Sequence, residues 1–286
     1  MTILVTGSSG FIGSNLIRFF QKKNIKFFGV DKVFNPYFKM KNFAKFNLND
    51  KSEILRLFGK QKIKKVIHLA ALPGFVNCHK KPKKAYEDNV TATLNLLTVC
   101  KSFGIKDIIV ASSMGVDNFY ENPSIYALTK SACENICRSF NKIYKMNIKI
   151  CKISNVFGPY SLHKLSSVHA FIKQIINNKK IQIHRKGMQE RDFIFVEDVC
   201  KKLYLFLNSR KSIEEFKINN NRYLRIIDLV HILNKISKKI ISYEFVKTPD
   251  GYDDTVYNKK ILKEKKDLIK KFAITYNWYK NIYNIK

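Results

Sequence analysis

A tyrosine and a lysine four residues apart, Tyr126 and Lys130, could together perform proton transfer. On a helix this spacing places the phenol and the ammonium on one face, one turn apart. A phenol with a pKa of about 10 is a poor base at neutral pH, but a nearby positive charge stabilises the phenolate and lowers that pKa. The pair therefore predicts a tyrosine base with a lysine partner. The alternative is an ordinary amphipathic helix, in which this spacing often occurs by chance.

Glycines cluster in a second segment, TGSSGFIG at 6–13, between an apolar β-type run and a helical pattern. Without side chains, the backbone can approach a pyrophosphate, which would rest on the N–H groups at the positive end of the helix. Asp31 ends the next expected strand, where a carboxylate binds adenosine ribose hydroxyls and repels a 2′-phosphate. This predicts a site for NAD, although Lys32 leaves room for NADP. The alternative is a glycine turn in an ordinary α/β sheet, with Asp31 as a helix cap. The candidate cofactor residues here are Gly7, Gly10, Phe11, Ile12, Gly13 and Asp31.

Strand-like and helix-like segments alternate along the first half of the chain, and these elements must position both groups. Such alternation is typical of a parallel sheet with helices on both faces. The expected strands are 3–5, 27–30, 66–69, 108–111 and 148–151, and the expected helices include 82–103 and 125–144. This predicts an α/β fold with a doubly wound parallel (Rossmann) sheet over residues 1–153.

Residues 154–286 are expected to form mainly a smaller C-terminal lobe that binds the substrate. The boundary between the two parts is not sharply defined, because no Pro/Gly/Ser linker marks it. The pattern predicts helices near 165–178, 197–208 and 225–238, and short strands near 181–184, 215–218 and 240–246. A lysine-rich stretch around 258–271 is expected to form a solvated helix face.

Composition excludes several classes of protein. The chain has 286 residues, 45% of them hydrophobic, which suits a large buried core and not a disordered chain. No apolar run approaches the ~18 residues that span a bilayer, and no signal-peptide pattern is present, so a cytoplasmic protein without a membrane span is expected. The formal net charge is +31, yet only eight of the 53 basic residues are arginine. Because arginine is preferred for base and bidentate phosphate recognition, attraction of an anionic metabolite is favoured over nucleic-acid binding.

The six cysteines contain no C-x-x-C pair and predict no disulfide framework. Cys133 and Cys137 lie four apart on an expected helix and could hold a metal ion. No His or Cys pair is spaced to complete such a site, so two packed thiols and no metal are expected.

The G-x-x-G-x-x-G spacing of the glycine segment, with Y-x-x-x-K at 126–130, resembles the extended short-chain dehydrogenase/reductase family, specifically its nucleotide-sugar epimerase/dehydratase branch. The resemblance covers nearly the whole chain and implies a Rossmann fold that binds NAD, with Tyr126 and Lys130 beside the nicotinamide. It also implies cofactor contacts near the adenine, at a strand end and at a helix start. These contacts fall on Asn47, Leu48, Leu69, Ala70, Ala71 and Asn89. Asn47 stands where the family usually has Asp, so that contact is altered.

By the same resemblance, Ser113 matches the Ser or Thr that hydrogen-bonds the reacting sugar hydroxyl. The alternative is a strand-end serine that satisfies backbone groups. Members that remove water across C5–C6 resemble Thr-Asp-Glu here, but Ser113 is followed by Met114 and Gly115. Neither of these side chains can transfer a proton, which disfavours 4,6-dehydration. The VDN at 116–118 departs from the usual V-Y-G, and the segment that follows is short, so the sugar is not identified.

The segment KISNVFGP at 152–159 resembles the family's R-x-x-N-x-Y-G-P. The resemblance implies that Asn155 binds the substrate near its diphosphate. Lys152 replaces the usual arginine, and such a change is not neutral at a bidentate site.

The segment RDFIFVEDV at 191–199 resembles another family motif, in which Arg191 would grip the nucleotide diphosphate with its planar guanidinium. The alternative is a surface ion pair of Arg191 with Asp192 or Glu190. A second diphosphate arginine has no clear match in 248–254.

These residues predict an NAD-dependent nucleotide-sugar epimerase, acting at C4 of a UDP-hexose or UDP-uronate. Tyr126 would take the C4 hydroxyl proton, Ser113 would polarise the same oxygen, and the 4-keto sugar would be reduced again on its other face. One alternative is a nucleotide-sugar 4-keto reductase or 4-dehydrogenase on the same fold. Another is a non-catalytic NAD- or RNA-binding relative. By analogy with the family, a homodimer and a role in polysaccharide biosynthesis are expected.

Overall fold

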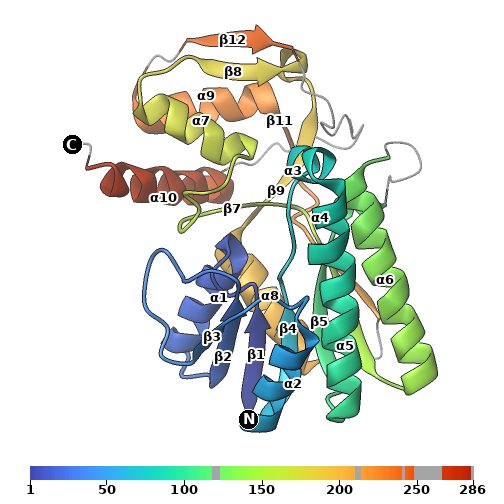
Figure 1. The fold of residues 1–286 in the computed structure, drawn as a ribbon. Helices are drawn as coiled ribbons and strands as arrows, with labels where there is room; N and C mark the ends of the chain where they lie inside the picture. The colour runs from blue at the N-terminus through green and yellow to red at the C-terminus, as the bar shows by residue number, and fades with distance from the viewer. Residues whose placement is uncertain (118–122, 210–213, 240–241, 248–265, 285–286) are drawn as a thin grey trace. The chain divides into compact units, whose positions relative to one another are not determined.

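The structure is a computed structural model, and it describes residues 1–117, 123–209, 214–239, 242–247 and 266–284 (Figure 1). The chain divides into two compact units. The first comprises Met1–Ile153 and Glu197–Ile218, and the second comprises Ser154–Val196 and Asn219–Lys286.

A seven-stranded sheet forms the centre of the first unit, with every neighbouring pair of strands parallel. Its order is β10 (Glu215–Ile218), β6 (Asn147–Ile153), β5 (Asp107–Ser113), β4 (Ile63–His68), β1 (Thr2–Thr6), β2 (Phe27–Asp31) and β3 (Phe43–Lys45). The side chains of the central strands β1, β4, β5 and β6 are mostly buried, because helices cover both faces of the sheet. This confirms the predicted doubly wound α/β class.

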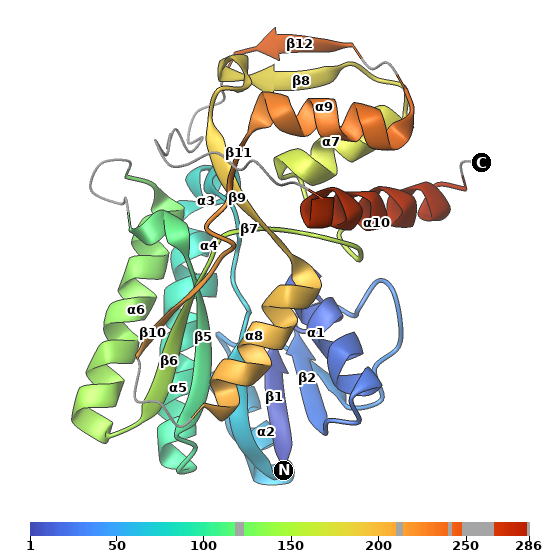
Figure 2. The same cartoon turned by 180° about the vertical axis from the view of Figure 1, so that it is seen from behind.

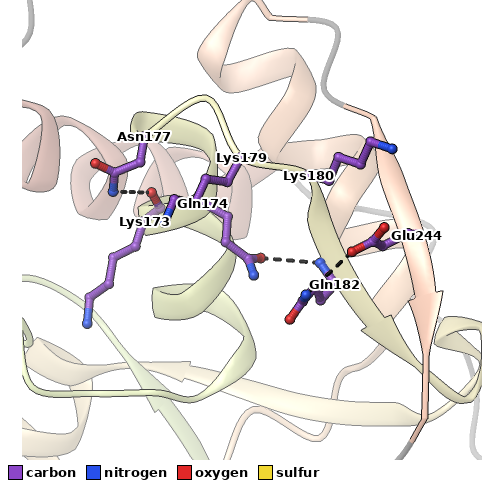
Figure 3. Close-up of a pocket in the computed structure, with 7 residues that line it drawn as sticks. All are labelled: Lys173, Gln174, Asn177, Lys179, Lys180, Gln182 and Glu244. Carbon is purple, nitrogen blue, oxygen red and sulfur yellow. Dashed lines mark hydrogen bonds between the residues drawn. The ribbon is translucent and has the colours of Figure 1, made fainter.

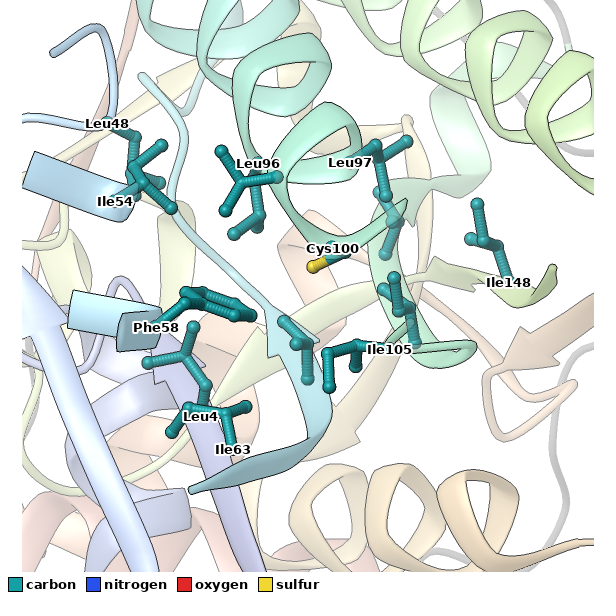
Figure 4. Packing of buried hydrophobic residues seen from close by; sticks show 14 of the residues in the cluster. Leu4, Leu48, Ile54, Phe58, Ile63, Leu96, Leu97, Cys100, Ile105 and Ile148 are labelled. Carbon is teal, nitrogen blue, oxygen red and sulfur yellow. The ribbon is translucent and has the colours of Figure 1, made fainter. Parts of the chain in front are cut away.

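Helices pack on both faces of this sheet (Figure 1 and Figure 2). One face carries α2 (Lys51–Lys60), α5 (Ala92–Ser102) and α6 (Ile125–Tyr144), whose apolar side chains form a core with the strands (Figure 4). The other face carries α1 (Phe11–Lys22) and α8 (Val196–Asn208), where the rings of Phe19 and Phe20 pack against Tyr204. Short helices α3 (Phe75–Lys80) and α4 (Pro82–Tyr86) precede α5.

The expected helix at 82–103 is interrupted by a π-helical turn, η1 (Glu87–Thr91). The backbone N–H of Ala92 donates to the carbonyl of Glu87, five residues back. The Asn89 carbonyl instead accepts the Thr93 hydroxyl at 2.5 Å and the Cys133 thiol at 3.2 Å. Side chains thus take the place of a regular helical bond. Such turns are frequent at functional sites.

The second unit has its own core and two small sheets. A three-stranded sheet has the order β11 (Tyr223–Arg225), β9 (Glu190–Phe195), β7 (Asn155–Phe157), and β12 (Tyr243–Val246) pairs with β8 (Ile181–His184). Three helices supply the apolar side chains: α7 (Ser167–Ile176), α9 (Ile226–Ser237) and α10 (Lys266–Ile282). The lysine-rich stretch around 258–271 was expected to be a solvated helix face. Its described part begins α10, which contributes the buried side chains of Leu268 and Phe272 to this core.

Residues 197–218 were expected in the second lobe but belong to the first unit. Strand β10 pairs with β6 in register, and two lysines from the sheet bind the end of α8. Lys149 is fully buried and donates to the carbonyls of Phe206 and Ser209 at 2.9 and 2.5 Å, while Lys65 donates to Asn208 at 3.0 Å. Cations at a helix C-terminus bind its unpaired carbonyls and complement its dipole. These long-range contacts leave no local sequence signal.

Within the described residues, no helix is long and apolar enough to cross a membrane. All six cysteines are buried and free of disulfides, and the described part of the chain contains no group of three or more His, Cys, Asp or Glu side chains that could hold a metal ion.

Two glycines provide a matched test of the packing. A Cβ on Gly13 would collide with the Gly7 carbonyl and lie 2.8 Å from the Ser8 Cα, whereas a Cβ on Gly59 in α2 would meet nothing within 4 Å. Gly13→Ala should therefore lower both the free energy of unfolding and the affinity for NAD, because the backbone must shift. Gly59→Ala should stabilise the protein by up to about 1 kcal/mol, because alanine favours the helix. Urea unfolding and cofactor titration measure both, and equal effects of the two changes would contradict the packing described here.

Candidate active site

Ser113, Tyr126 and Lys130 come together at the end of β5 and the start of α6. The Ser124 hydroxyl caps α6 by accepting the N–H of Ala127 at 3.1 Å, which places Tyr126 in the first turn. The hydroxyl of Ser113 lies near the Tyr126 phenol and favours its ionised form. One turn further along the helix, the Lys130 ammonium donates to the carbonyl of Ala111 at 2.9 Å. Strand β5 thus carries Ser113 of the predicted group, and its Ala111 carbonyl binds Lys130.

Burial dominates the electrostatics of these residues. It raises the pKa of Tyr126 to about 12, while the nearby Ser113 hydroxyl acts in the opposite direction. Burial also lowers the pKa of Lys130, whose side chain is enclosed. A phenol in this environment is neutral at pH 7. It can act as a base only when additional positive charge is brought next to it.

The glycine turn joins β1 to α1 and has the shape that a dinucleotide requires. Gly7 has a φ of 69°, and a Cβ there would lie 2.6 Å from the backbone nitrogen of Ala70. Gly10 begins α1 without any side-chain cap, which leaves the helix N-terminus open to a phosphate. The close packing of Gly7 brings the turn against Leu69 and Ala70, two of the predicted cofactor residues.

Asp31 is fixed beside this turn. Its carboxylate accepts the backbone N–H of Ser9 at 3.0 Å and that of Val33 at 3.3 Å. Burial raises the pKa of Asp31, and these backbone hydrogen bonds act against that increase. The carboxylate therefore stands at the end of β2, where the ribose of a dinucleotide binds in folds of this class. The cradle and this carboxylate fit NAD.

The remaining predicted cofactor residues differ in what they present. The side chain of Leu48 is buried in the core, so only its backbone can contact a cofactor, whereas Asn47 is exposed after β3. Asn89 holds the segment after β4. Its Oδ1 accepts the N–H of Leu72 at 2.7 Å, and its Nδ2 donates to the Thr129 hydroxyl at 2.9 Å. Asn89 therefore links the segment after β4, which carries Ala71, to α6.

A buried histidine that the sequence analysis did not identify as a site residue connects the two halves of this site. His68 Nδ1 lies 2.6 Å from the Thr6 hydroxyl, and its Nε2 lies 3.0 Å from the Thr93 hydroxyl. The Thr93 hydroxyl donates to the Asn89 carbonyl, so it must accept from Nε2–H. Thr6 then donates to Nδ1. Burial, reinforced by the positive charge of Lys130, lowers the pKa of His68 to about 3, which keeps the ring neutral.

Lys152 does not present a free cation to a ligand. Its ammonium is buried and contacts three carboxylates: Asp117 at 2.7 Å, Glu215 at 3.0 Å and Glu134 at 3.5 Å. Burial lowers the pKa of Lys152, but these acidic partners outweigh it and the net shift is upward. Glu134 also accepts the hydroxyl of Ser112 at 2.6 Å. Lys152, on β6, therefore connects this strand to β10 and to α6. It also connects β6 to Asp117, the residue that follows the short helix η2 (Met114–Val116).

Two of the three predicted substrate residues, Asn155 and Arg191, lie in the second unit. Asn155 is exposed on β7. Arg191 is buried on β9 and does not lie at the surface, and its Nη1 donates to the Glu190 carbonyl at 2.8 Å. The Asp192 carboxylate accepts backbone N–H groups, at 3.1 Å from Asn220. The sequence at 248–254, where a second arginine was sought, lies outside the described residues.

A pocket of about 520 Å³ occurs elsewhere in the second unit, on α7, β8 and β12 (Figure 3). Its polar side chains bind one another: Gln174 accepts the N–H of Gln182, and Gln182 donates to Glu244, both at 3.4 Å. None of the predicted site residues lines this pocket. It is therefore not part of the candidate active site.

The sheet, the glycine turn and the Ser–Tyr–Lys group together define an enzyme of the extended short-chain dehydrogenase/reductase class. The family model described as "NAD dependent epimerase/dehydratase family" matches residues 3–220. The chain belongs to this family, and its cofactor is NAD.

Individual relatives differ in the reaction that their names give. A UDP-glucuronate 4-epimerase from Thermodesulfobacterium geofontis is 30% identical over 69% of this chain and 69% of its own length. A dTDP-D-glucose 4,6-dehydratase from Dictyostelium discoideum is 29% identical over 84% of this chain, which spans only 61% of that protein. The crystal structure of a UDP-glucose 4-epimerase with UDP-glucose, from Thermotoga maritima, has a TM-score of 0.88 at 21% identity and covers 99% of this chain and 100% of that one.

Stability should fall in mild acid because of His68. Its pKa is depressed in the folded state, so below the unfolded value of about 6.5 only the unfolded chain gains this proton. The resulting loss approaches about 1.4 kcal/mol per pH unit between the two pKa values. His68→Gln should reduce the slope of the unfolding free energy between pH 6.5 and 5. Urea unfolding across that range measures it, and an unchanged slope would show that the ring is already charged or exposed.

Lys152 and Lys217 provide a second comparison, since both bind Asp117 but only Lys152 is buried. Lys152→Met removes one of the two cations, Lys152 and Arg138, that contact the buried Glu134 carboxylate, and it should cost about 2–4 kcal/mol in the free energy of unfolding. Lys217→Met removes a half-exposed partner and should cost less than about 1 kcal/mol. Equal losses in urea unfolding would contradict the structural role of the Lys152 cluster.

Proposed function

We propose that this enzyme is an NAD-dependent nucleotide-sugar epimerase that inverts C4 of a UDP-hexose or UDP-uronate. The observation that carries the proposal is the Ser113–Tyr126–Lys130 group, with Met114 and Gly115 following the serine. This arrangement provides one base for one hydroxyl. It offers no carboxylic acid and second base at the positions that dehydrating relatives use.

Tyr126, as phenolate, would take the proton of the C4 hydroxyl, and Ser113 would donate a hydrogen bond to the same oxygen. NAD, when bound, would supply both the acceptor for the C4 hydride and the donor for the later reduction of the 4-keto sugar. The products of the first step are a 4-keto sugar and a protonated Tyr126. After the sugar presents its other face, Tyr126 would give its proton back to the C4 oxygen as C4 is reduced again. The sugar regains both the hydride and the proton that it lost, so the reaction has no net change in oxidation state and consumes no external reductant.

Lys130 would bring the phenol into the working range of pH. The pKa of about 12 that burial gives Tyr126 is too high for a base at pH 7. The Lys130 ammonium, one turn away, and the positive charge of oxidised NAD both favour the phenolate. The tyrosine would thus be activated mainly when the oxidised cofactor is bound, which is when a base is needed.

In the second unit, Arg191 and Asn155 would bind the substrate's diphosphate and its surroundings, as in the motifs that they match. The named relatives include epimerases for both a UDP-uronate and a UDP-hexose, which supports a UDP-sugar without choosing between the two. A 4-keto reductase or 4-dehydrogenase is the second candidate, because it needs the same three catalytic residues.

A homodimer is part of the proposal. Large apolar side chains are exposed on two helices of the sheet unit, Leu94 on α5 and Leu128 and Ile143 on α6. A second copy of the chain would bury them by pairing the same two helices.

Tyr126→Phe should lower turnover by at least about 100-fold, because the base is removed, and should leave NAD affinity nearly unchanged. Tyr144→Phe, at the far end of the same helix, is the control and should keep full activity. Proton NMR of UDP-sugars incubated without added cofactor measures the new anomeric signal. Conversion only after NADH or NADPH is supplied would instead identify a reductase. Full turnover by Tyr126→Phe would reject the proposed base.

A further inference from the structure

One buried carboxylate binds two lysines, of which one, Lys32, directly follows Asp31. Asp88, in the π-helical turn η1, has a side chain only 5% exposed, and its Oδ2 lies 2.7 Å from Lys32 Nζ and 3.3 Å from Lys84 Nζ. Both lysine side chains are half exposed. Lys32 follows the last residue of β2, and Lys84 lies in α4. Segments 56 residues apart in the chain thus share one ion-pair group.

We propose that Asp88 is a specificity residue for the cofactor: it holds Lys32 and Lys84 away from the position where the 2′-phosphate of NADP would bind. The proposal concerns the choice between NAD and NADP and does not depend on the sugar. Lys32 is the residue that makes this choice ambiguous in the sequence. A cation next to the strand-end carboxylate is what accommodates a 2′-phosphate in folds of this class.

The summed charge of Asp31, Asp88 and the two lysines explains how Asp88 affects the choice between NAD and NADP. Asp31 and Asp88 carry two negative charges, and Lys32 and Lys84 carry two positive charges, so the group has no net charge. Removing the charge of Asp88 leaves an excess of one positive charge and releases two flexible ammonium groups. A phosphate group with nearly two negative charges gains from such a change, whereas the ribose hydroxyls of NAD gain little.

Neighbouring residues fix the position of Asp88. The flexible side chains of Lys32 and Lys84 therefore adopt the conformations that reach its carboxylate. The next residue, Asn89, binds Leu72 through both ends of its amide, at 2.7 and 3.3 Å. The Asn89 carbonyl is held by Thr93 and Cys133. A rigid carboxylate can retain Lys32 in a constant direction, which a carboxylate on a mobile loop could not do.

The test compares the dissociation constants of NADH and NADPH for the purified chain after bound cofactor has been removed. Asp88→Asn should lower the ratio of the NADPH constant to the NADH constant by about tenfold. The decrease should be larger on an Asp31→Asn background, where the repelling carboxylate is neutral. Adding Lys32→Gln to Asp88→Asn should restore most of the original ratio. Thermal unfolding of each variant verifies that it is folded.

Glu87→Gln is the matched control. It removes the same charge from the same turn, one residue away, and no ion pair between Glu87 and Lys32 is present in the described structure. A ratio that falls equally in Glu87→Gln and Asp88→Asn would overturn the proposal, because general charge would then explain it. So would a ratio that is unchanged in Asp88→Asn on both backgrounds.

Lys32→Gln alone provides a measurement that does not require Asp88 to be changed. Since Asp88 already occupies the Lys32 ammonium, the affinity for NADPH should stay the same within about twofold. A clear loss of NADPH affinity in this variant would mean that Lys32 already serves the 2′-phosphate, and the proposal would be wrong.

Discussion

A neutral histidine between two threonine hydroxyls is the interaction on which the rest of the site depends. His68 ends β4, and it reaches Thr6 at the end of β1 and Thr93 in α5. From there the hydrogen bonds continue through Asn89 and Thr129 to the Tyr126 carbonyl. Every donor and acceptor in this series of hydrogen bonds has a partner, so the direction from donor to acceptor is fixed in each bond. A charged ring would reverse one bond and leave a buried proton without an acceptor.

This series of hydrogen bonds links the glycine turn to the helix that carries Tyr126. The glycine turn follows Thr6 directly, and the tyrosine lies on the helix that Asn89 holds through Thr129. Hydride transfer requires the two reacting carbons to be placed within a fraction of an ångström. Buried hydrogen bonds of fixed length suit that requirement better than contacts between flexible side chains. Residues outside the Ser113–Tyr126–Lys130 group therefore help to hold that group in place.

Local patterns in the sequence predicted the parts of the fold that local physics determines. The glycines at 7, 10 and 13 and the four-residue spacing of Tyr126 and Lys130 are short-range requirements, and the parallel sheet followed from apolar runs that alternate with helical periodicity. The sequence analysis did not foresee the contacts made across long stretches of chain. Asp88 with Lys32, Lys152 with Glu215 and Lys149 with the end of α8 all join residues more than 50 positions apart. Lys149 and Lys152 are buried structural cations, a role that the sequence analysis did not predict for either of them.

The first unit is not continuous in the chain, and this has a consequence for synthesis. Its edge strand, β10, and the helix that covers Phe20, α8, are made only after the whole first segment of the second unit has been translated. Until residue 218 has left the ribosome, β6 has an open edge and one face of the sheet lacks part of its cover. Open strand edges and uncovered apolar faces promote aggregation. The nascent chain therefore passes through a stage of about sixty-five residues in which most of the sheet can form but cannot be closed, and chaperone binding is expected to concentrate there.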